Sequence, residues 1–114
     1  MHMTKKIAVI GNYLPRQCGI ATFTTDLCDA LSGQMHHADE NLIAVAMDDI
    51  EAGYDYPARV KFQVRVQSQP DYVRAAEFLN AHKFDVAILQ HEFGIYGGNN
   101  GAHVLHLMRN LRTP

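Results

Sequence analysis

A short polar segment near residue 90 carries the side chains best suited to chemistry. Gln90, His91 and Glu92 place an amide, an imidazole and a carboxylate in a row, directly after the apolar run 86–89. An imidazole can exchange protons near neutral pH, and a positioned imidazole can donate a hydrogen bond to a substrate or stabilise a departing group. Because open parallel sheets bind ligands at the carboxyl ends of their strands, the sequence predicts a functional site here.

Each of these residues also has an ordinary structural explanation. His91 can be a strand-end histidine satisfied by backbone groups, and Glu92 is as well suited to accepting backbone N–H bonds as to contacting a substrate. Gly94, Gly97 and Gly98 permit either left-handed turns or the close approach of a ligand. The local sequence leaves both explanations open.

A second candidate segment lies near the start of the chain, in the loop 11–19. Gly19 and Ile20 stand where an expected helix begins, and the unpaired N–H groups and dipole of a helix N-terminus favour a phosphate. Arg16 can add a charge-assisted contact. The simpler alternative is that Gly19 merely lets the chain turn into the helix and that Arg16 is a solvated loop charge.

The rest of the chain alternates between strand and helix patterns. Apolar runs predict strands at 5–10, 42–47 and 84–89, the last with the length of a strand buried on both faces, and alternation across 60–66 predicts a strand with one wet face at a sheet edge. Helical spacing predicts helices at 20–32, 70–82 and 101–112. In the first of these helices we expect five residues to pack on the sheet: Ile20, Phe23, Leu27, Ala30 and Leu31.

The order β-α-β-β-α-β-α predicts an α/β fold. We expect a Rossmann-like open, mainly parallel sheet of about four strands with helices on both faces. The 114 residues suffice for a single domain. Thr113 and Pro114 follow a helix, where the next parallel strand would begin, so we expect residues 1–114 to be a fragment of a longer chain.

Composition narrows the class of protein. The chain is 47% hydrophobic and 19% charged with a formal charge of −2, which is typical of a soluble globular domain and gives no electrostatic reason to expect nucleic acid or an anionic membrane as a partner. No apolar run is long enough to span a membrane, and the N-terminus lacks a signal-peptide pattern, so we expect a cytoplasmic protein. Cys18 and Cys28 form neither a metal-ligand spacing nor a disulfide framework.

Two long segments together resemble a known family. PRQCGIATFTTDLCDAL (15–31) and DVAILQHEFGIYGG (85–98), separated by DYVRAAEFLN (71–80), resemble the N-terminal half of family 4 glycosyltransferases of the GT-B fold. The likeness is closest to bacterial mannosyltransferase-like members that begin with a P-R-x-C-G-I-A-T-F segment, and it spans essentially the whole chain.

The resemblance implies a truncated half of a GT-B fold: a Rossmann-like domain that binds the acceptor and faces a second, donor-binding domain across a cleft. It implies that the loop after the first strand reaches the phosphates of the sugar nucleotide and that His91, with Glu92 as its neighbour, lies near the reacting sugar. The residues that match this loop are Arg16, Gln17, Cys18 and Gly19, followed by Ile20. Family 4 enzymes retain configuration, and GT-B enzymes generally need no catalytic metal or other cofactor.

Two other classes of function stay open. The chain can be a stand-alone nucleotide or small-ligand binding module, although it lacks the G-x-G-x-x-G and P-loop spacings. It can also be an interaction domain, since a halved enzyme offers an exposed sheet edge or cleft face for homo-oligomer formation. His103 and His106 share a helical face but match no established metal-site spacing, so we expect no metal.

Overall fold

The computed structural model describes residues 5–90 and 95–114. Its elements follow the predicted order, with a short helix and a 3-10 turn in addition. They are β1 (Ile7–Gly11), α1 (Gly19–Ser32), α2 (Ala38–Asn41), β2 (Leu42–Asp48), β3 (Val60–Arg65), α3 (Gln69–His82), β4 (Val86–Leu89), η1 (Asn99–Gly101) and α4 (Val104–Asn110). The connection between the first helix and the second strand contains the helical turn α2.

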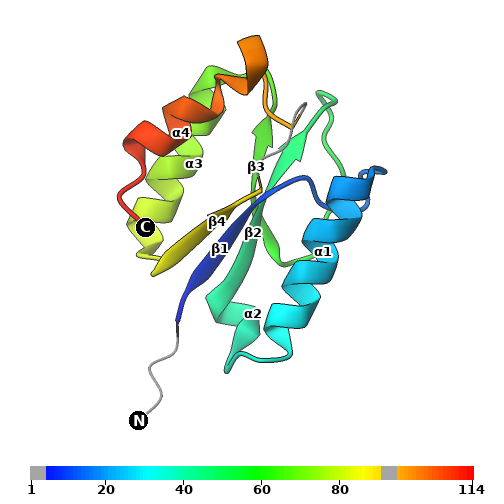
Figure 1. Ribbon diagram of the computed structural model, residues 1–114, viewed down its shortest axis with the longest axis vertical. Helices are drawn as coiled ribbons and strands as arrows, with labels where there is room; N and C mark the ends of the chain where they lie inside the picture. The colour runs from blue at the N-terminus through cyan, green and yellow to red at the C-terminus, as the bar shows by residue number, and fades with distance from the viewer. Residues whose placement is uncertain (1–4, 91–94) are drawn as a thin grey trace.

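The four strands form one sheet in the order β3-β2-β1-β4, and every neighbouring pair is parallel. This confirms the predicted α/β fold with an open parallel sheet. β3 lies at an edge, as the alternation of its residues predicted, and β1 lies between β2 and β4 (Figure 1). The chain segments that follow β1, β2 and β4 therefore leave the same end of the sheet next to one another.

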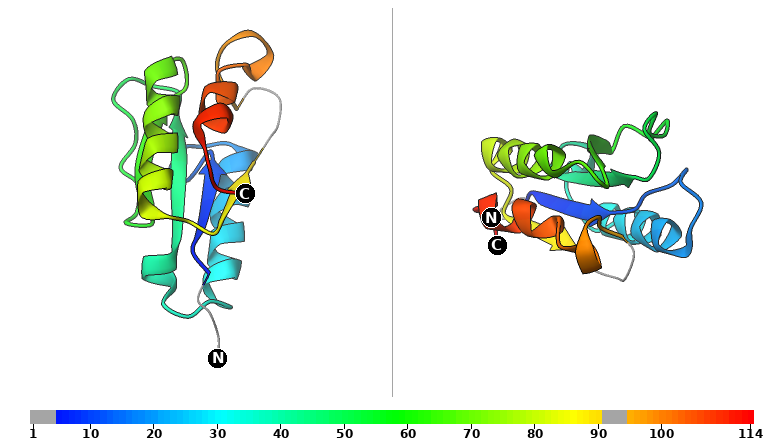
Figure 2. Two further views of the ribbon diagram at one scale, coloured as in Figure 1. Left: turned by 90° about the vertical axis from the view of Figure 1, so that its left-hand side faces the viewer. Right: turned by 90° about the horizontal axis from the view of Figure 1, so that it is seen from above.

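Helices cover both faces of the sheet, as predicted. α3 and α4 lie side by side on one face, and α1 covers the other (Figures 1 and 2). The division follows the period of two in each strand: Ala8 and Ile10 of β1 pack toward α3 and α4, whereas Val9 packs toward α1. All seven residues of β2 are buried, because its side chains meet helices on both faces.

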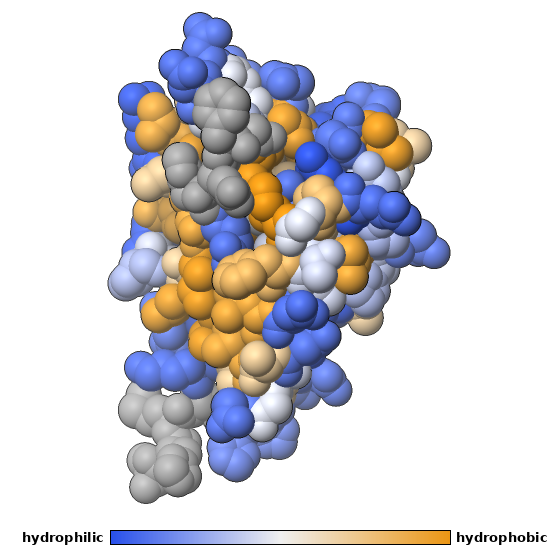
Figure 3. All heavy atoms as spheres, turned by 45° about the vertical axis from the view of Figure 1, so that its right-hand side comes forward, coloured by the Kyte–Doolittle hydropathy of each residue, from blue (hydrophilic) through white to orange (hydrophobic). Residues whose placement is uncertain are grey.

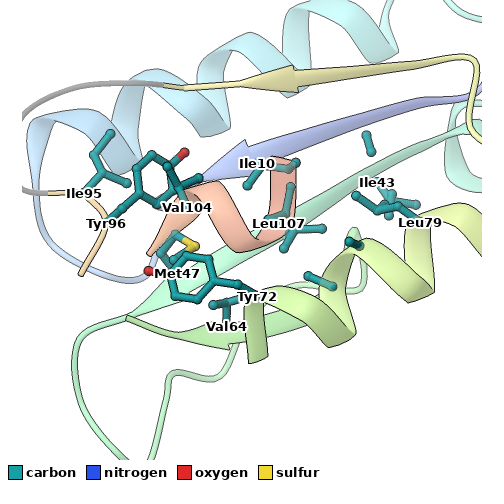
Figure 4. Packing of buried hydrophobic residues seen from close by; sticks show 14 of the residues in the cluster. Ile10, Ile43, Met47, Val64, Tyr72, Leu79, Ile95, Tyr96, Val104 and Leu107 are labelled. Carbon is teal, nitrogen blue, oxygen red and sulfur yellow. The ribbon is translucent and has the colours of Figure 1, made fainter. Parts of the chain in front are cut away.

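The larger core lies between the sheet and the helices α3 and α4. Figure 4 shows Tyr72 and Leu79 of α3 and Leu107 of α4 turned toward Ile10, Ile43 and Met47 of the sheet. Each such side chain contributes about 1.5–3 kcal/mol when it is fully buried. Tyr72 satisfies its hydroxyl at the same time, donating a 2.7 Å hydrogen bond to the carbonyl of Val66.

The buried face of α1 agrees with the prediction in part. Ile20, Leu27 and Leu31 pack against the core as expected. Ala21, Thr24 and Cys28 face the sheet, while Phe23 is 59% exposed and Ala30 is exposed as well. Small residues occupy the contact because this face of β2 is itself small, with Ala44 and Ala46, and thus lets the helix approach closely. The Thr24 hydroxyl is satisfied within the helix by a 2.9 Å bond to the Ile20 carbonyl.

The elements β4 and α4 are shorter and more exposed than predicted. α4 spans only Val104–Asn110 within the predicted range 101–112, and its Met108 is 51% exposed. β4 is an edge strand rather than one buried on both faces, and Val86 is 38% exposed. On the face of the molecule that Figure 3 shows, hydrophobic side chains gather into a patch near the middle of the view.

The outer edge of β4 forms a backbone hydrogen bond with the last residue of the sequence. The Ala87 N–H donates to the Pro114 carbonyl across 2.8 Å, so the residues after α4 run back alongside β4. This is where the sequence pattern placed the start of a further strand. Within residues 5–90 and 95–114, no helix is long and apolar enough to cross a membrane.

Candidate functional site

The two candidate segments meet at the carboxyl end of the sheet. β1 ends at Gly11 and the neighbouring strand β4 at Leu89, and the N–H of Gln90 donates a 2.9 Å hydrogen bond to the Ile10 carbonyl. A Cβ atom on Gly11 would lie 3.0 Å from the Gln90 Cβ atom, so the absence of a side chain at Gly11 makes room for Gln90. The fold therefore places Gln90, where the first candidate segment begins, beside Gly11, where the loop 11–19 begins.

Three of the predicted site residues lie outside the described part of the chain. These are His91, Glu92 and Gly94. Their predicted roles at the reacting sugar and in the glycine turn stay predictions.

Cys18 caps the N-terminus of α1. It has extended backbone angles, and its Sγ atom accepts a 3.3 Å hydrogen bond from the Ala21 N–H. The Asn12 side chain donates to the same sulfur across 3.6 Å. Both Cys18 and Cys28 are free thiols, as the sequence indicated. Cys18 therefore has a structural role, because its sulfur accepts a hydrogen bond from a backbone N–H group at the start of α1. Its predicted role near a ligand stays a prediction.

Gly19 is the first residue of α1, and its surroundings are open. Apart from its two chain neighbours and the backbone of α1 itself, no atom of the described residues lies within 4 Å of a Cβ atom built on Gly19. The N–H groups of Gly19 and Ile20 have no hydrogen-bond partner in the described part of the chain. Since α1 has 14 residues, its dipole is well developed and its exposed N–H groups suit an anionic ligand. Gln17 beside them is exposed.

Arg16 is anchored to the protein rather than solvated. Its side chain is 13% exposed and lies 3.6 Å from the Asp49 carboxylate. Its NH1 group donates 2.9 Å hydrogen bonds to the Asn12 side chain and to the Met47 carbonyl. The alternative of a solvated loop charge is therefore wrong. Arg16 fastens the β1–α1 loop to the end of β2, and in this arrangement its guanidinium is already engaged.

Gly97 and Gly98 dock their segment on the loop between β3 and α3. The Gly97 N–H donates to the Tyr72 hydroxyl across 3.1 Å, and a Cβ atom on Gly97 would lie 2.2 Å from the Val66 carbonyl oxygen. Gly98 has a left-handed φ of +81° and donates to the Gln67 side chain across 3.3 Å. Packing within the chain thus accounts for both glycines.

The sequence reasoning missed one acidic residue at this edge. Asp48 directly follows the predicted strand 42–47; it is 4% exposed and accepts a hydrogen bond from the Tyr56 hydroxyl. Burial raises the pKa of Asp48 above the ordinary carboxyl range, and this outweighs the opposite effects of the Tyr56 hydrogen bond and of Arg16. The available signal was a carboxylate directly after the apolar run 42–47.

The tyrosines near the site are packing residues. Tyr13 is 2% exposed and Tyr96 is 5% exposed. The Tyr96 hydroxyl donates to the Gln90 carbonyl, which ties the segment after β4 to the end of that strand. Burial raises the pKa values of both phenols, so both stay protonated at neutral pH.

A metal centre is not formed within residues 5–90 and 95–114, where no group of three or more His, Cys, Asp or Glu side chains is arranged to hold an ion. The ring of His103 packs instead against Tyr72, with 6.0 Å between centroids, and lies 6.2 Å from the ring of His106.

Two of the hollows lined by residues 5–90 and 95–114 open near this end of the sheet. The smaller, about 280 Å³, lies at the ends of β2 and β3 and includes Asp48, Asp49 and Arg65 in its lining. The larger, about 700 Å³, lies between the loop after β1 and the loop before β3. Both exceed the volume of a water molecule many times over.

Comparison of the chain with known protein families, curated proteins and solved structures finds no match. The case for a function therefore rests on the residues themselves and on their geometry.

Proposed function

We propose that the chain is the acceptor-side half of a sugar-nucleotide-dependent retaining glycosyltransferase of the GT-B type, with mannosyl transfer as the activity that the sequence resembles most. The donor nucleotide is then held mainly by a second domain outside residues 1–114. The observation that carries the proposal is the meeting of the two resembling segments: Gln90 hydrogen-bonds to Ile10 immediately before the loop 11–19.

The exposed start of α1 supports a phosphate-binding role. In a sugar nucleotide the leaving group is a nucleoside diphosphate, whose negative charge grows as the glycosyl bond breaks. N–H groups that already point out of a helix end stabilise that charge without reorganisation. Gly19 and Ile20 offer two such groups with no partner among the described residues.

His91 and Glu92 complete the proposal from the sequence. His91 donates a hydrogen bond to the reacting sugar or to the departing phosphate, and Glu92 orients His91 or binds the acceptor. Arg16 acts in this scheme as a positioning residue, because its contacts hold the phosphate-facing loop against β2.

The proposal that a second domain holds the donor nucleotide gives a first test. By calorimetry, residues 1–114 alone should show weak or undetectable binding of GDP-mannose and of UDP-glucose, because the donor-binding domain is absent. Tight binding of either sugar nucleotide would instead support a stand-alone nucleotide-binding module.

Transfer activity gives the second test, in the longer protein that carries the donor domain. His91→Ala should leave the thermal unfolding midpoint unchanged and reduce transfer strongly. Gly19→Ala should also leave stability intact, since open space surrounds that position, and should raise the KM for the sugar nucleotide because the methyl group obstructs the phosphate. Unchanged kinetics in both variants would remove these residues from the site.

A further inference from the structure

The larger hollow near the carboxyl end of the sheet, which we name the Tyr56 groove, is a shallow depression on the α1 side. Residues 13–15 form one wall and residues 55–57 the other, and the lining is completed by Thr25, Asp29 and Arg59. Its volume of about 700 Å³ lies within the range of about 300–1,000 Å³ that is common for small-molecule sites.

The walls of the Tyr56 groove are fixed by hydrogen bonds inside the protein. The Leu14 N–H donates to the Thr25 hydroxyl across 3.2 Å, which holds the first wall against α1. In the second wall, the Val60 N–H closes a turn onto the Pro57 carbonyl at 3.0 Å, and the Tyr56 hydroxyl is held by Asp48. A ligand therefore meets surfaces that lose little conformational freedom on binding.

The charges of the groove argue against an anionic ligand. Arg59, whose side chain is 18% exposed, is paired at 3.3 Å with the largely exposed carboxylate of Asp29. Asp55 adds a second carboxylate, so the three formal charges sum to −1. A phosphate or nucleotide would be repelled here, whereas hydroxyl groups can donate to the carboxylates and accept from the guanidinium.

Much of the remaining lining is apolar, apart from the hydroxyl groups of Tyr13 and Thr25. Leu14, Pro15 and Pro57 present hydrocarbon surface, and Tyr56 contributes a ring whose hydroxyl is already used by Asp48. A pyranose ring has the matching chemistry: C–H groups on its faces, which pack on aromatic and aliphatic surface, and hydroxyls around its rim.

From this combination we infer that the Tyr56 groove binds a neutral saccharide. The Asp29–Arg59 pair and Asp55 receive its hydroxyls, and the Tyr56 ring with the two prolines receives its C–H faces. The groove adjoins the candidate site, because Tyr56 contacts Asp48 at the end of β2 and the carbonyl of Tyr13 accepts a 3.1 Å bond from the Arg16 N–H. The further step, that this saccharide is the acceptor of the transferase, rests on the function proposed above.

The test is an NMR titration of residues 1–114 with methyl α-mannopyranoside, mannobiose and cellobiose at millimolar concentration. At least one of these should shift the amide signals of Leu14, Thr25 and Arg59 in a saturable manner, and GDP should not. No saturable shift with any of the three saccharides overturns the inference. A proline-rich peptide that alone shifts these signals would overturn it in favour of peptide binding.

Substitutions inside and outside the groove test whether its lining residues contact the saccharide or affect binding only through the stability of the fold. Arg59→Ala should weaken saccharide binding about tenfold, because it removes a charged hydrogen-bond donor and frees Asp29. Should Arg59→Ala fail to fold, Asp55→Ala at an exposed position serves in its place and should weaken binding by a smaller factor. Arg109→Ala, on the exposed surface of α4, removes the same charge outside the groove and should leave binding unchanged.

A pair of substitutions isolates the ring of Tyr56. Tyr56→Phe keeps the ring and should retain most of the binding, whereas Tyr56→Ser should lose it. Equal binding by the two variants would contradict a stacking role. Because the titration needs no donor domain, its outcome is independent of the transfer assay: saccharide binding without transfer would leave this inference standing and count against the proposed enzyme.

Discussion

The guanidinium of Arg16 donates a 2.9 Å hydrogen bond to the backbone carbonyl of Met47, 31 positions along the chain. This contact joins the loop after β1 to the end of β2. Both ends of the bond lie at the carboxyl edge of the sheet, next to the open start of α1. The shape of the candidate phosphate-binding loop therefore depends on a side chain of that loop.

Arg16→Ala should destabilise the protein by about 1.5–3 kcal/mol, because it leaves the Met47 carbonyl and the Asn12 side chain without their charged donor. The free energy of unfolding in urea measures this effect. Arg16→Lys keeps the charge but cannot reproduce the two contacts of NH1. Its free energy of unfolding should therefore lie between those of the original protein and of Arg16→Ala. An alanine variant as stable as the original would show that Arg16 is available for a ligand.

Gly97→Ala should destabilise the protein by about 1–3 kcal/mol or more, since its Cβ atom would lie 2.2 Å from the Val66 carbonyl oxygen and the backbone has to move. Gly19→Ala is the matched control, because no described atom outside its chain neighbours and the backbone of α1 lies within 4 Å of the new methyl group. It should be neutral or stabilise by about 0.4–1 kcal/mol by restricting the unfolded chain. Thermal unfolding of the two variants side by side measures the difference, and equal losses would contradict the packing of Gly97.

Asp71 should make stability fall in acid. Arg65 donates through Nε and NH2 to its carboxylate, which is 9% exposed, and these hydrogen bonds lower the pKa of Asp71 from 3.8 to about 2. Its contribution, about 1–2 kcal/mol after allowance for solvent screening, is fully present above pH 3.8 and is lost as the pH falls toward 2.

Urea titrations at several pH values test this contribution. Asp71→Asn should be less stable at neutral pH and should lose this part of the acid dependence. If the variant and the original protein lost stability in parallel between pH 4 and pH 2, the pairing would not be the cause.

Asp48 should have the opposite effect. Burial raises its pKa, so the folded protein binds a proton more readily than the unfolded chain does. Ionised Asp48 therefore costs stability, and this cost grows as the pH rises above 3.8 through the folded-state pKa. Asp48→Asn keeps an acceptor for the Tyr56 hydroxyl and should increase the free energy of unfolding at pH 7. A loss of stability at pH 7 would show that the charge of Asp48 is needed.

The sequence by itself determined the type and order of the elements. Apolar runs and helical spacing depend on residues close together in the chain, and they predicted the strands, the three main helices and the parallel α/β fold. Alternation across residues 60–66 also identified β3 as an edge strand, since one face of it carries polar side chains. The predicted limits were less accurate at β4 and α4, which span only Val86–Leu89 and Val104–Asn110.

The tertiary structure decided what each polar residue does. From the sequence alone Arg16 can be a solvated charge, but in the fold it donates a hydrogen bond to the Met47 carbonyl of β2. Gly97 can likewise be a flexible position in the sequence, but in the fold the Val66 carbonyl leaves no room for a side chain there. The small residues Ala21 and Thr24, rather than Phe23, face the sheet because β2 presents alanines to α1. All of these outcomes depend on contacts between segments far apart in the sequence, which local patterns of side chains do not encode.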